Sequence, residues 1–463
     1  MDTQFTVIQP PAQLLLTPAR RLGGWLCFGA LLLLAALLGQ PTPAHAQSTI
    51  ITVDADAPGP VYDGLAWETA FTTVQDALDL ANANGGVNYE IWVAEGVYYP
   101  DEGGGHVDND AGESFRLAWN NVQMYGGFGG YGIGETLRTQ RDWTAHPTIL
   151  SGDIDQNDAN ADGNFTAETW ADIQGSNARH VLWLDGVTNQ AINDATVLDG
   201  FIVTAGNAYG NVSPDSEGGG LYCAGNASGR ACSPALTNLT FSGNQAFGQT
   251  GANGYGGGMV NNGANGGMSS PALTNVAFTG NRAISESGSG DGGGMYNNSA
   301  FGVSSPTLTN VTFSGNTAER GGGMVNNGAN GVSSPTLTNV LFQGNSADAG
   351  GGMINDGTFG VSSPALTNVT FSGNRANIGG GIYSYAGSGV SSPTLENCVL
   401  WGNVASIIGA QLYNGPGATP AVRNSLVQGG YAGAGNLDAD PRFVAPIDAS
   451  SACLLYTSDA ADE

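Results

Sequence analysis

The sequence has no lysine: its 12 basic residues are all arginines, against 39 acidic residues, for a formal net charge of −27. Such a chain repels nucleic acid and anionic membranes, and it can attract cations. Only four histidines occur, at His45, His106, His146 and His180. With no lysine, no Gly-His-Gly context and no adjacent aspartates before residue 453, the chain lacks the paired acids and bases that polysaccharide lyases and hydrolases use.

Glycine is abundant instead. The 74 glycines and 20 prolines form about a fifth of the 463 residues, which is below the share typical of disordered low-complexity chains. Hydrophobic residues make up 41% of the chain, enough to form a core. We therefore expect a folded protein.

The N-terminus has the features of a secretory signal. Arg20 and Arg21 precede an apolar run over residues 22–39, and Ala44-His45-Ala46 follows as a cleavage site. This order predicts a signal peptide over residues 1–46, and an uncleaved membrane anchor is the alternative. The expected product is a monomeric, secreted or cell-surface chain without a membrane span.

The C-terminus departs from the pattern of the rest. Residues 453–463 look like the translation of a sequencing adapter, so we exclude them from the fold and expect the natural chain to be longer. Residues 47–452 keep ten arginines and 35 acidic residues, a net charge of about −25, and 24 of these acids lie between Asp54 and Asp199.

Few cysteines remain once both ends are set aside. Cys223 and Cys232 flank the short loop in CAGNASGRAC, which predicts a local disulfide in an exported protein. Two buried free thiols are the alternative. Cys398 stands where Val369 stands one repeat earlier, so we expect a small core residue there.

The dominant feature is an internal repeat. A Ser-Pro motif recurs with spacings of 37, 35, 29, 29, 29 and 27 residues, the last to a degenerate copy. Its prolines are Pro234, Pro271, Pro306, Pro335, Pro364, Pro393 and Pro420. A sustained period of 20–50 residues is typical of a solenoid.

Each repeat is built from short strands. In PTLTNVTFSGN, Leu308, Val311 and Phe313 can face one way if Asn310 forms a bend, because Asn tolerates the left-handed backbone conformation. The segment GGGMVNN supplies another strand, so each unit reads as three strands joined by Gly and Asn turns. A unit this small cannot bury its apolar face alone, and stacking on copies of itself solves this.

Stacking the units predicts a right-handed parallel β-helix in which equivalent side chains form ladders. One inward column would contain Phe241, Phe278, Phe313, Phe342 and Phe371. A second inward column, with amides bonded between successive bends, would contain Asn238, Asn275, Asn310, Asn339, Asn368 and Asn397. A leucine-rich repeat is the alternative fold, since LTNVTFSGN fits its motif, but the glycine triplet that follows disfavours the helix that fold needs.

The repeats resemble those of a known group of proteins. The Phe-x-x-Asn element followed by Gly-Gly-apolar, as in GGGLY (218–222) and GGGIY (379–383), is similar to polymorphic outer-membrane proteins and related β-helix surface proteins. Met259, Met295, Met324 and Met353 depart from the residues that group prefers. Segments 67–100, 125–128 and 436–444 look like bacterial choice-of-anchor, pectin-lyase-like proteins. The resemblance implies the fold, and this fold carries both enzymes and inert stalks.

The segment before the repeats predicts a cap. TTVQDALDLANANGG carries apolar residues at helical spacing, with Thr73 and Asp76 as a capping box. A short helix here would cover the open end of the solenoid, and YEIWVAEGVYY would form the first rung. The expected organisation is a signal peptide (1–46), cap and first rungs (47–113), early rungs with long acidic loops (114–202), regular repeats of about 29 residues (203–444), a truncated end (445–452) and the adapter-like tail (453–463).

One acidic stretch, GDIDQNDANADGN, resembles a calcium loop. Its opening follows the EF-hand pattern, but the closing glutamate falls one position early, so an irregular calcium site or a solvated loop is expected. The candidate ligands are Asp153, Asp155, Asp158, Asn160 and Asp162. The functional prediction is a surface or secreted stalk, an adhesin or carbohydrate-contacting module without a catalytic site. A polysaccharide lyase or glycoside hydrolase with its site on the loops of residues 100–200 is the alternative.

Overall fold

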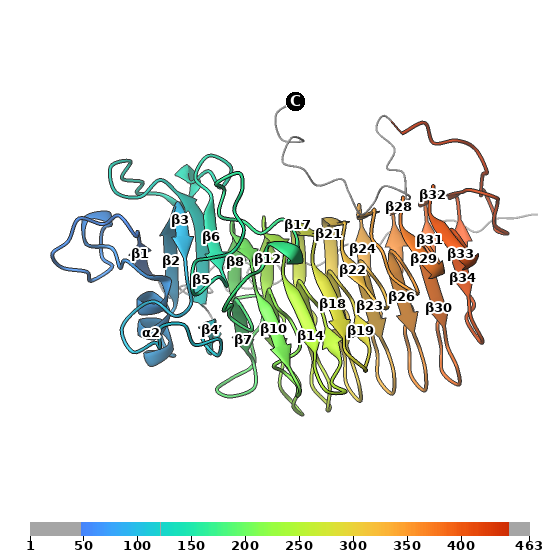
Figure 1. Ribbon diagram of the computed structural model, residues 1–463, viewed down its shortest axis with the longest axis horizontal. Helices are drawn as coiled ribbons and strands as arrows, with labels where there is room; N and C mark the ends of the chain where they lie inside the picture. Colours follow the sequence, from blue (N-terminus) through green and yellow to red (C-terminus); the bar gives the residue numbers. More distant parts are fainter. Residues whose placement is uncertain (1–47, 121, 444–463) are drawn as a thin grey trace, which may run out of the picture. The chain divides into compact units, whose positions relative to one another are not determined.

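The computed structural model describes residues 48–120 and 122–443. The expected signal peptide, the truncated end and the adapter-like tail lie outside the described residues. Within them, strands of successive rungs pair in parallel and stack along one axis (Figure 1). The fold is therefore an all-β parallel β-helix solenoid, as the repeats predicted. In this part of the chain no helix is long and apolar enough to cross a membrane.

The largest sheet contains 19 strands, and we call it the first sheet. Its strands are β1 (Thr49–Val53), β2 (Tyr89–Ala94), β3 (Gly96–Tyr98), β5 (Val122–Phe128), β6 (Thr148–Ser151), β8 (Val197–Asp199), β9 (Ile202–Thr204), β12 (Ala235–Thr237), β13 (Thr240–Ser242), β17 (Ala272–Thr279), β21 (Thr307–Ser314), β24 (Thr336–Thr338), β25 (Leu341–Gln343), β27 (Ala365–Thr367), β28 (Thr370–Ser372), β31 (Thr394–Glu396), β32 (Val399–Trp401), β35 (Ala421–Arg423) and β36 (Leu426–Val427). The strand β1 precedes β2 in the chain and pairs with it. The prediction that residues 89–99 form the first rung is therefore wrong, because β1 already lies before them in the stack.

The second sheet contains nine strands. They are β4 (Phe115–Leu117), β7 (Leu182–Asp185), β11 (Leu221–Ala224), β16 (Met259–Asn262), β20 (Met295–Asn298), β23 (Met324–Asn327), β26 (Met353–Asp356), β30 (Ile382–Tyr385) and β34 (Leu412–Asn414). Three smaller sheets contain β10 (Asn207–Gly210), β14 (Gln245–Gly248), β18 (Arg282–Ser285) and β22 (Thr317–Ala318), then β15 (Gly254–Tyr255) with β19 (Gly290–Asp291), and β29 (Arg375–Ile378) with β33 (Val404–Ile408).

The helices lie outside the repeats. Helix α2 (Val74–Ala83) packs at the β1 end of the stack (Figure 1), and Thr73 Oγ1 accepts the Asp76 backbone N–H at 3.2 Å. This confirms the predicted capping helix and its start. The others are the 3₁₀ turns η1 (Trp67–Thr69), η2 (Arg138–Gln140) and η3 (Trp170–Asp172).

The core consists of ladders, because equivalent residues pair in register: Phe313 lies opposite Phe342, and Met324 opposite Met353. The five predicted phenylalanines are fully buried, with ring centroids 4.6–4.9 Å apart and planes within 6° of parallel. The predicted Phe column is confirmed. The second sheet carries a separate row of buried apolar residues outside the main core. This row contains Tyr222, Val260, Tyr296, Val325 and Ile354.

Two ladders of buried amides were not predicted from the sequence. The asparagine that closes each Phe-x-Gly-Asn motif is buried and donates its Nδ2 to the Oδ1 of the next rung at 2.8–3.0 Å. This ladder contains Asn244, Asn281, Asn316, Asn345 and Asn374, and it ends at Asn403, which closes the related Leu-Trp-Gly-Asn segment and accepts from Asn374. The second sheet carries another ladder, through Asn261, Asn297, Asn326 and Asn355.

Candidate functional site

The column of bend asparagines exists, but it lies on the outside of the first sheet. The six residues adopt φ values of 51–56°, and Asn310 is exposed whereas Leu308 and Val311 are buried. The prediction of a second inward column is therefore wrong. A single left-handed residue breaks the alternation of a strand, so Leu308 and Val311, three residues apart, both face inward while the Asn310 side chain turns outward.

The exposed amides are linked in one direction. The Nδ2 of each asparagine donates to the Oδ1 of the preceding rung, at 3.1 Å from Asn275 to Asn238 and from Asn310 to Asn275. The same bond, at 3.2 Å, continues through Asn339 to Asn368. We call these five residues, Asn238, Asn275, Asn310, Asn339 and Asn368, the outer amide ladder.

The outer amide ladder begins at a charged pair. Asn238 Nδ2 donates to Asp199 Oδ1 at 2.8 Å, and Arg141 Nη2 pairs with the other oxygen of the same carboxylate. Only 9% of the Arg141 side chain is exposed, and its Nη1 donates to the carbonyls of Gly126 and Asp199 at 3.1 Å. The Asp199 carboxylate is thus paired with the Arg141 guanidinium while it also accepts a hydrogen bond from the first amide of the ladder.

Trp143 lies beside this pair. The Arg141 guanidinium carbon lies 5.0 Å from the centroid of the Trp143 ring, within the range of a cation–π contact. Trp143 as a residue is 40% exposed. Arg141 therefore holds the indole next to the start of the outer amide ladder.

Trp143 and three residues of the outer amide ladder, Asn238, Asn275 and Asn310, line one groove of about 410 Å³ on the outer side of the first sheet. Its lining contains no charged side chain: Trp143, Thr144, Thr148, Gly200, Phe201, Ile202, Asn238, Leu239, Thr240, Asn275, Val276, Ala277, Asn310 and Thr312. An indole offers a broad apolar face, while amides and hydroxyls both donate and accept hydrogen bonds. This combination suits a ligand that has apolar faces edged with hydroxyl groups.

Sequence reasoning missed Trp143, Arg141 and Asp199. The first two belong to RDWTAHP, part of a non-repeating loop, and Asp199 is 58 residues further along than Arg141. The only signal was a tryptophan two residues after an arginine in a non-repeating loop.

The acidic stretch holds the predicted calcium ligands in a hydrogen-bonded loop. Its carboxylates accept hydrogen bonds from the surrounding loop: Asp153 from the backbone of Asn157 and Asp158, at 3.0 and 3.1 Å, and Asp155 from that of Ser176 at 2.9 Å. Asp162 and Asn160 accept from Asn164 and Phe165 in the same way. Across the described residues, no group of three or more His, Cys, Asp or Glu side chains is arranged to hold a metal ion. The predicted ligands thus have hydrogen-bond partners within the loop, and the calcium site stays a prediction.

Two of these acids line a different feature, a cavity of about 180 Å³ that Tyr99 also lines. Burial raises the pKa of Asp158 to about 7, even though the backbone of Gln174 and the amide of Asn177 donate to its carboxylate. Burial also raises the pKa of Asp153, and it raises that of Tyr99 to about 12. A carboxyl group that stays protonated near neutral pH can act as a general acid.

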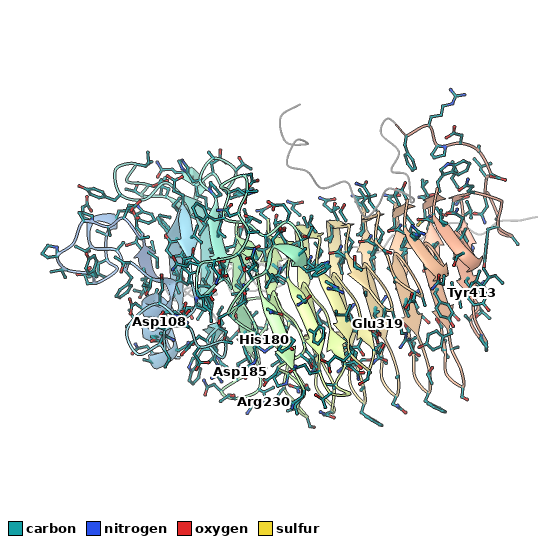
Figure 2. The ribbon with its side chains drawn as sticks, in the orientation of Figure 1. Asp108, His180, Asp185, Arg230, Glu319 and Tyr413 are labelled. Atoms are coloured by element: carbon teal, nitrogen blue, oxygen red, sulfur yellow. A yellow bond between two sulfur atoms is a disulfide. The ribbon has the colours of Figure 1, made fainter. Side chains whose placement is uncertain are left out.

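The three histidines among the described residues do not converge. Burial opposes a charge on His106, but Glu113 and Asp79, 2.8 and 3.3 Å from its two ring nitrogens, raise its pKa overall. His146 pairs with Glu95 at 3.0 Å. Burial lowers the pKa of His180 to about 4. Figure 2 shows His180, Glu319 and Tyr413 in this order along the stack axis.

The three cysteines of the described residues are either disulfide-bonded or buried. Cys223 and Cys232 are joined by a disulfide. Cys398 is a buried thiol in the main core, and burial raises its pKa to about 11. An uncharged, buried thiol of this kind is a poor nucleophile.

Comparison with protein-family models, with curated proteins and with solved structures gives no match for this chain. Its function therefore has to be inferred from the side chains themselves.

Proposed function

We propose that the protein is an exported or cell-surface β-helix stalk whose outer groove binds polysaccharide. The observation that carries this proposal is the groove, in which an exposed indole, Trp143, adjoins a row of exposed amides without any charged side chain in the lining. The expected signal peptide and the resemblance of the repeats to β-helix surface proteins support an exported location. The stacked rungs supply a rigid frame that keeps the amides in register.

The proposal is tested by glycan-array binding, followed by affinity electrophoresis in gels that contain the polysaccharides retained on the array. Trp143→Ala should weaken retention at least tenfold, because it removes the apolar face of the groove. Trp170→Ala is the matched control, since Trp170 is 38% exposed but lies outside the groove lining. Equal retention of wild type and both variants, or no retention on any glycan, would contradict the proposal.

A polysaccharide hydrolase is the second candidate, because Asp158, with its pKa near 7, and Asp153 both line one cavity. A reducing-end assay on a panel of polysaccharides tests it. Turnover that Asp158→Asn abolishes and Trp143→Ala leaves unchanged would favour this candidate over the stalk.

A further inference from the structure

The amide side chains of the outer amide ladder recur along the stack axis but not along the strands. Along the stack the same amide recurs once per rung, about 4.8 Å apart, whereas along a strand the side chains change from residue to residue. In the third unit, for example, Thr309, Asn310 and Thr312 are followed along the strand by Ser314. A polymer with a short repeat therefore matches this surface only when it lies parallel to the stack axis.

Each amide of the ladder has hydrogen-bonding capacity left over. Asn275 uses one N–H to reach Asn238, and its Oδ1 accepts one N–H from Asn310. A primary amide has two N–H groups and two lone pairs on oxygen, so one donor and one acceptor remain on every rung. Asn275 and Asn310 are exposed and line the groove, where a hydroxyl group, itself both donor and acceptor, pairs with each.

The charges of the groove and of the chain indicate that the ligand is uncharged. The lining is uncharged, and the one carboxylate at the start of the ladder, Asp199, is paired with Arg141. The whole chain carries −27, so a polyanion would be repelled at low salt. The groove has no lysine or arginine in its lining to reverse that repulsion.

We infer that the ligand is an uncharged, extended β-1,4-linked glycan that lies along the stack, with one sugar per rung and a terminal sugar on Trp143. This inference rests on the polysaccharide-binding function proposed above. An extended β-1,4-linked pyranose chain advances by nearly one rung spacing per sugar, whereas α-1,4-linked chains coil away from a straight row. Five rungs carry the ladder, from Asn238 to Asn368, so with the terminal sugar on Trp143 the surface accommodates about six sugars.

The first experiment is calorimetric titration of the whole protein with xylo-oligosaccharides, cello-oligosaccharides and N-acetylchito-oligosaccharides of two to seven sugars. Malto-oligosaccharides and oligogalacturonates of the same lengths serve as α-linked and anionic comparisons. Affinity for at least one neutral β-1,4 series should rise with each sugar up to about six and then level off. The comparison series should bind at least tenfold more weakly, and the oligogalacturonates should weaken further as salt is lowered.

The second experiment removes single amides. Asn310→Gly keeps a residue that tolerates positive φ but deletes the amide, so affinity for the hexasaccharide should fall about threefold to tenfold, the equivalent of one hydrogen bond. Asn424→Gly is the matched control, because Asn424 has φ 47° and does not line the groove.

The outcomes separate the two proposals. Binding that levels off at two sugars, prefers α-linked or anionic chains, or is unchanged in Asn310→Gly would overturn the inference while leaving a polysaccharide-binding groove in place. No binding to any glycan would overturn both.

Discussion

The two Asn ladders of one repeat unit allow a sharp test of what stabilises the solenoid. Asn345 is fully buried, whereas Asn339, six residues earlier, is exposed. Asn345→Ala removes four hydrogen bonds. Asn345 Oδ1 accepts from the backbone N and the Nδ2 of Asn316, at 3.0 and 2.9 Å, and its Nδ2 donates to Phe313 O and Asn374 Oδ1 at 2.9 Å.

The expected cost follows from those bonds. At about 0.5–1.5 kcal/mol for each buried bond, Asn345→Ala should destabilise the protein by about 2–6 kcal/mol. The exposed Asn339 makes two amide bonds of 3.2 Å that water can replace, and its φ of 55° is unfavourable for Ala. Asn339→Ala should therefore cost only about 1–2 kcal/mol, and Asn339→Gly should recover most of it.

Hydrogen exchange is the appropriate assay, because the rungs of a solenoid can unfold separately and a single melting curve would average over them. The amide of Asn316 should lose protection in Asn345→Ala and keep it in Asn339→Ala, with urea denaturation supplying the overall free-energy differences. Equal or larger destabilisation by Asn339→Ala would refute the view that the buried ladder, rather than the exposed one, carries the stability.

Three further predictions concern the core, the acidic cavity and the acidic loop. Phe313→Ala should cost about 3–5 kcal/mol and reduce hydrogen-exchange protection mainly in the rungs of Phe278 and Phe342; equal loss in every rung would contradict it. Because burial raises the pKa of Asp158 to about 7, the folded state binds a proton that the unfolded state releases near pH 4, so this group destabilises the fold progressively as pH rises from about 4 to 7. Asp158→Asn should flatten the fall in Tm between pH 4.5 and 7.5, and an unchanged profile would argue against the raised pKa. Since no group of three or more His, Cys, Asp or Glu among the described residues is arranged to hold a metal ion, a chelator should leave Tm unchanged, whereas a chelator-sensitive melt that Asp158→Ala with Asp162→Ala abolishes would support the calcium site.

The stack and its core could be predicted because they depend on local pattern. The 29-residue period and the alternation of Leu308, Val311 and Phe313 require only that identical units place identical residues at the same height. The capping helix was equally local, as its apolar spacing and the Thr73 cap are contained in one short segment.

The sequence pattern did not show whether the side chains of the outer amide ladder point inward or outward. Asn310 was correctly placed at a bend, but whether a bend residue points inward depends on how the left-handed conformation redirects the strand on each side of it. The Asn that closes Phe-x-Gly-Asn, such as Asn316, was visible as a repeated letter. Its burial became evident only with the backbone carbonyl of Phe278 beside it.

The groove depends on long-range contacts. Trp143 gains its place from Arg141, which is held by Asp199 from a later rung. A loop insert carries no periodicity, so no pattern in the sequence connects these three residues.

The identical register of neighbouring units bears on how such a chain can evolve. Duplicating residues 317–345 in frame would give the new unit the neighbours that the old unit already has, since Phe313 pairs with Phe342 and Asn316 bonds to Asn345 in the existing stack. The duplication would lengthen the stack by about 4.8 Å without new packing solutions, while the capping helix and the Trp143 end stayed unchanged. Because residues 317–345 include Asn339, each such duplication would also add one asparagine to the outer amide ladder, so the length of the stack and the length of the proposed binding surface would change together.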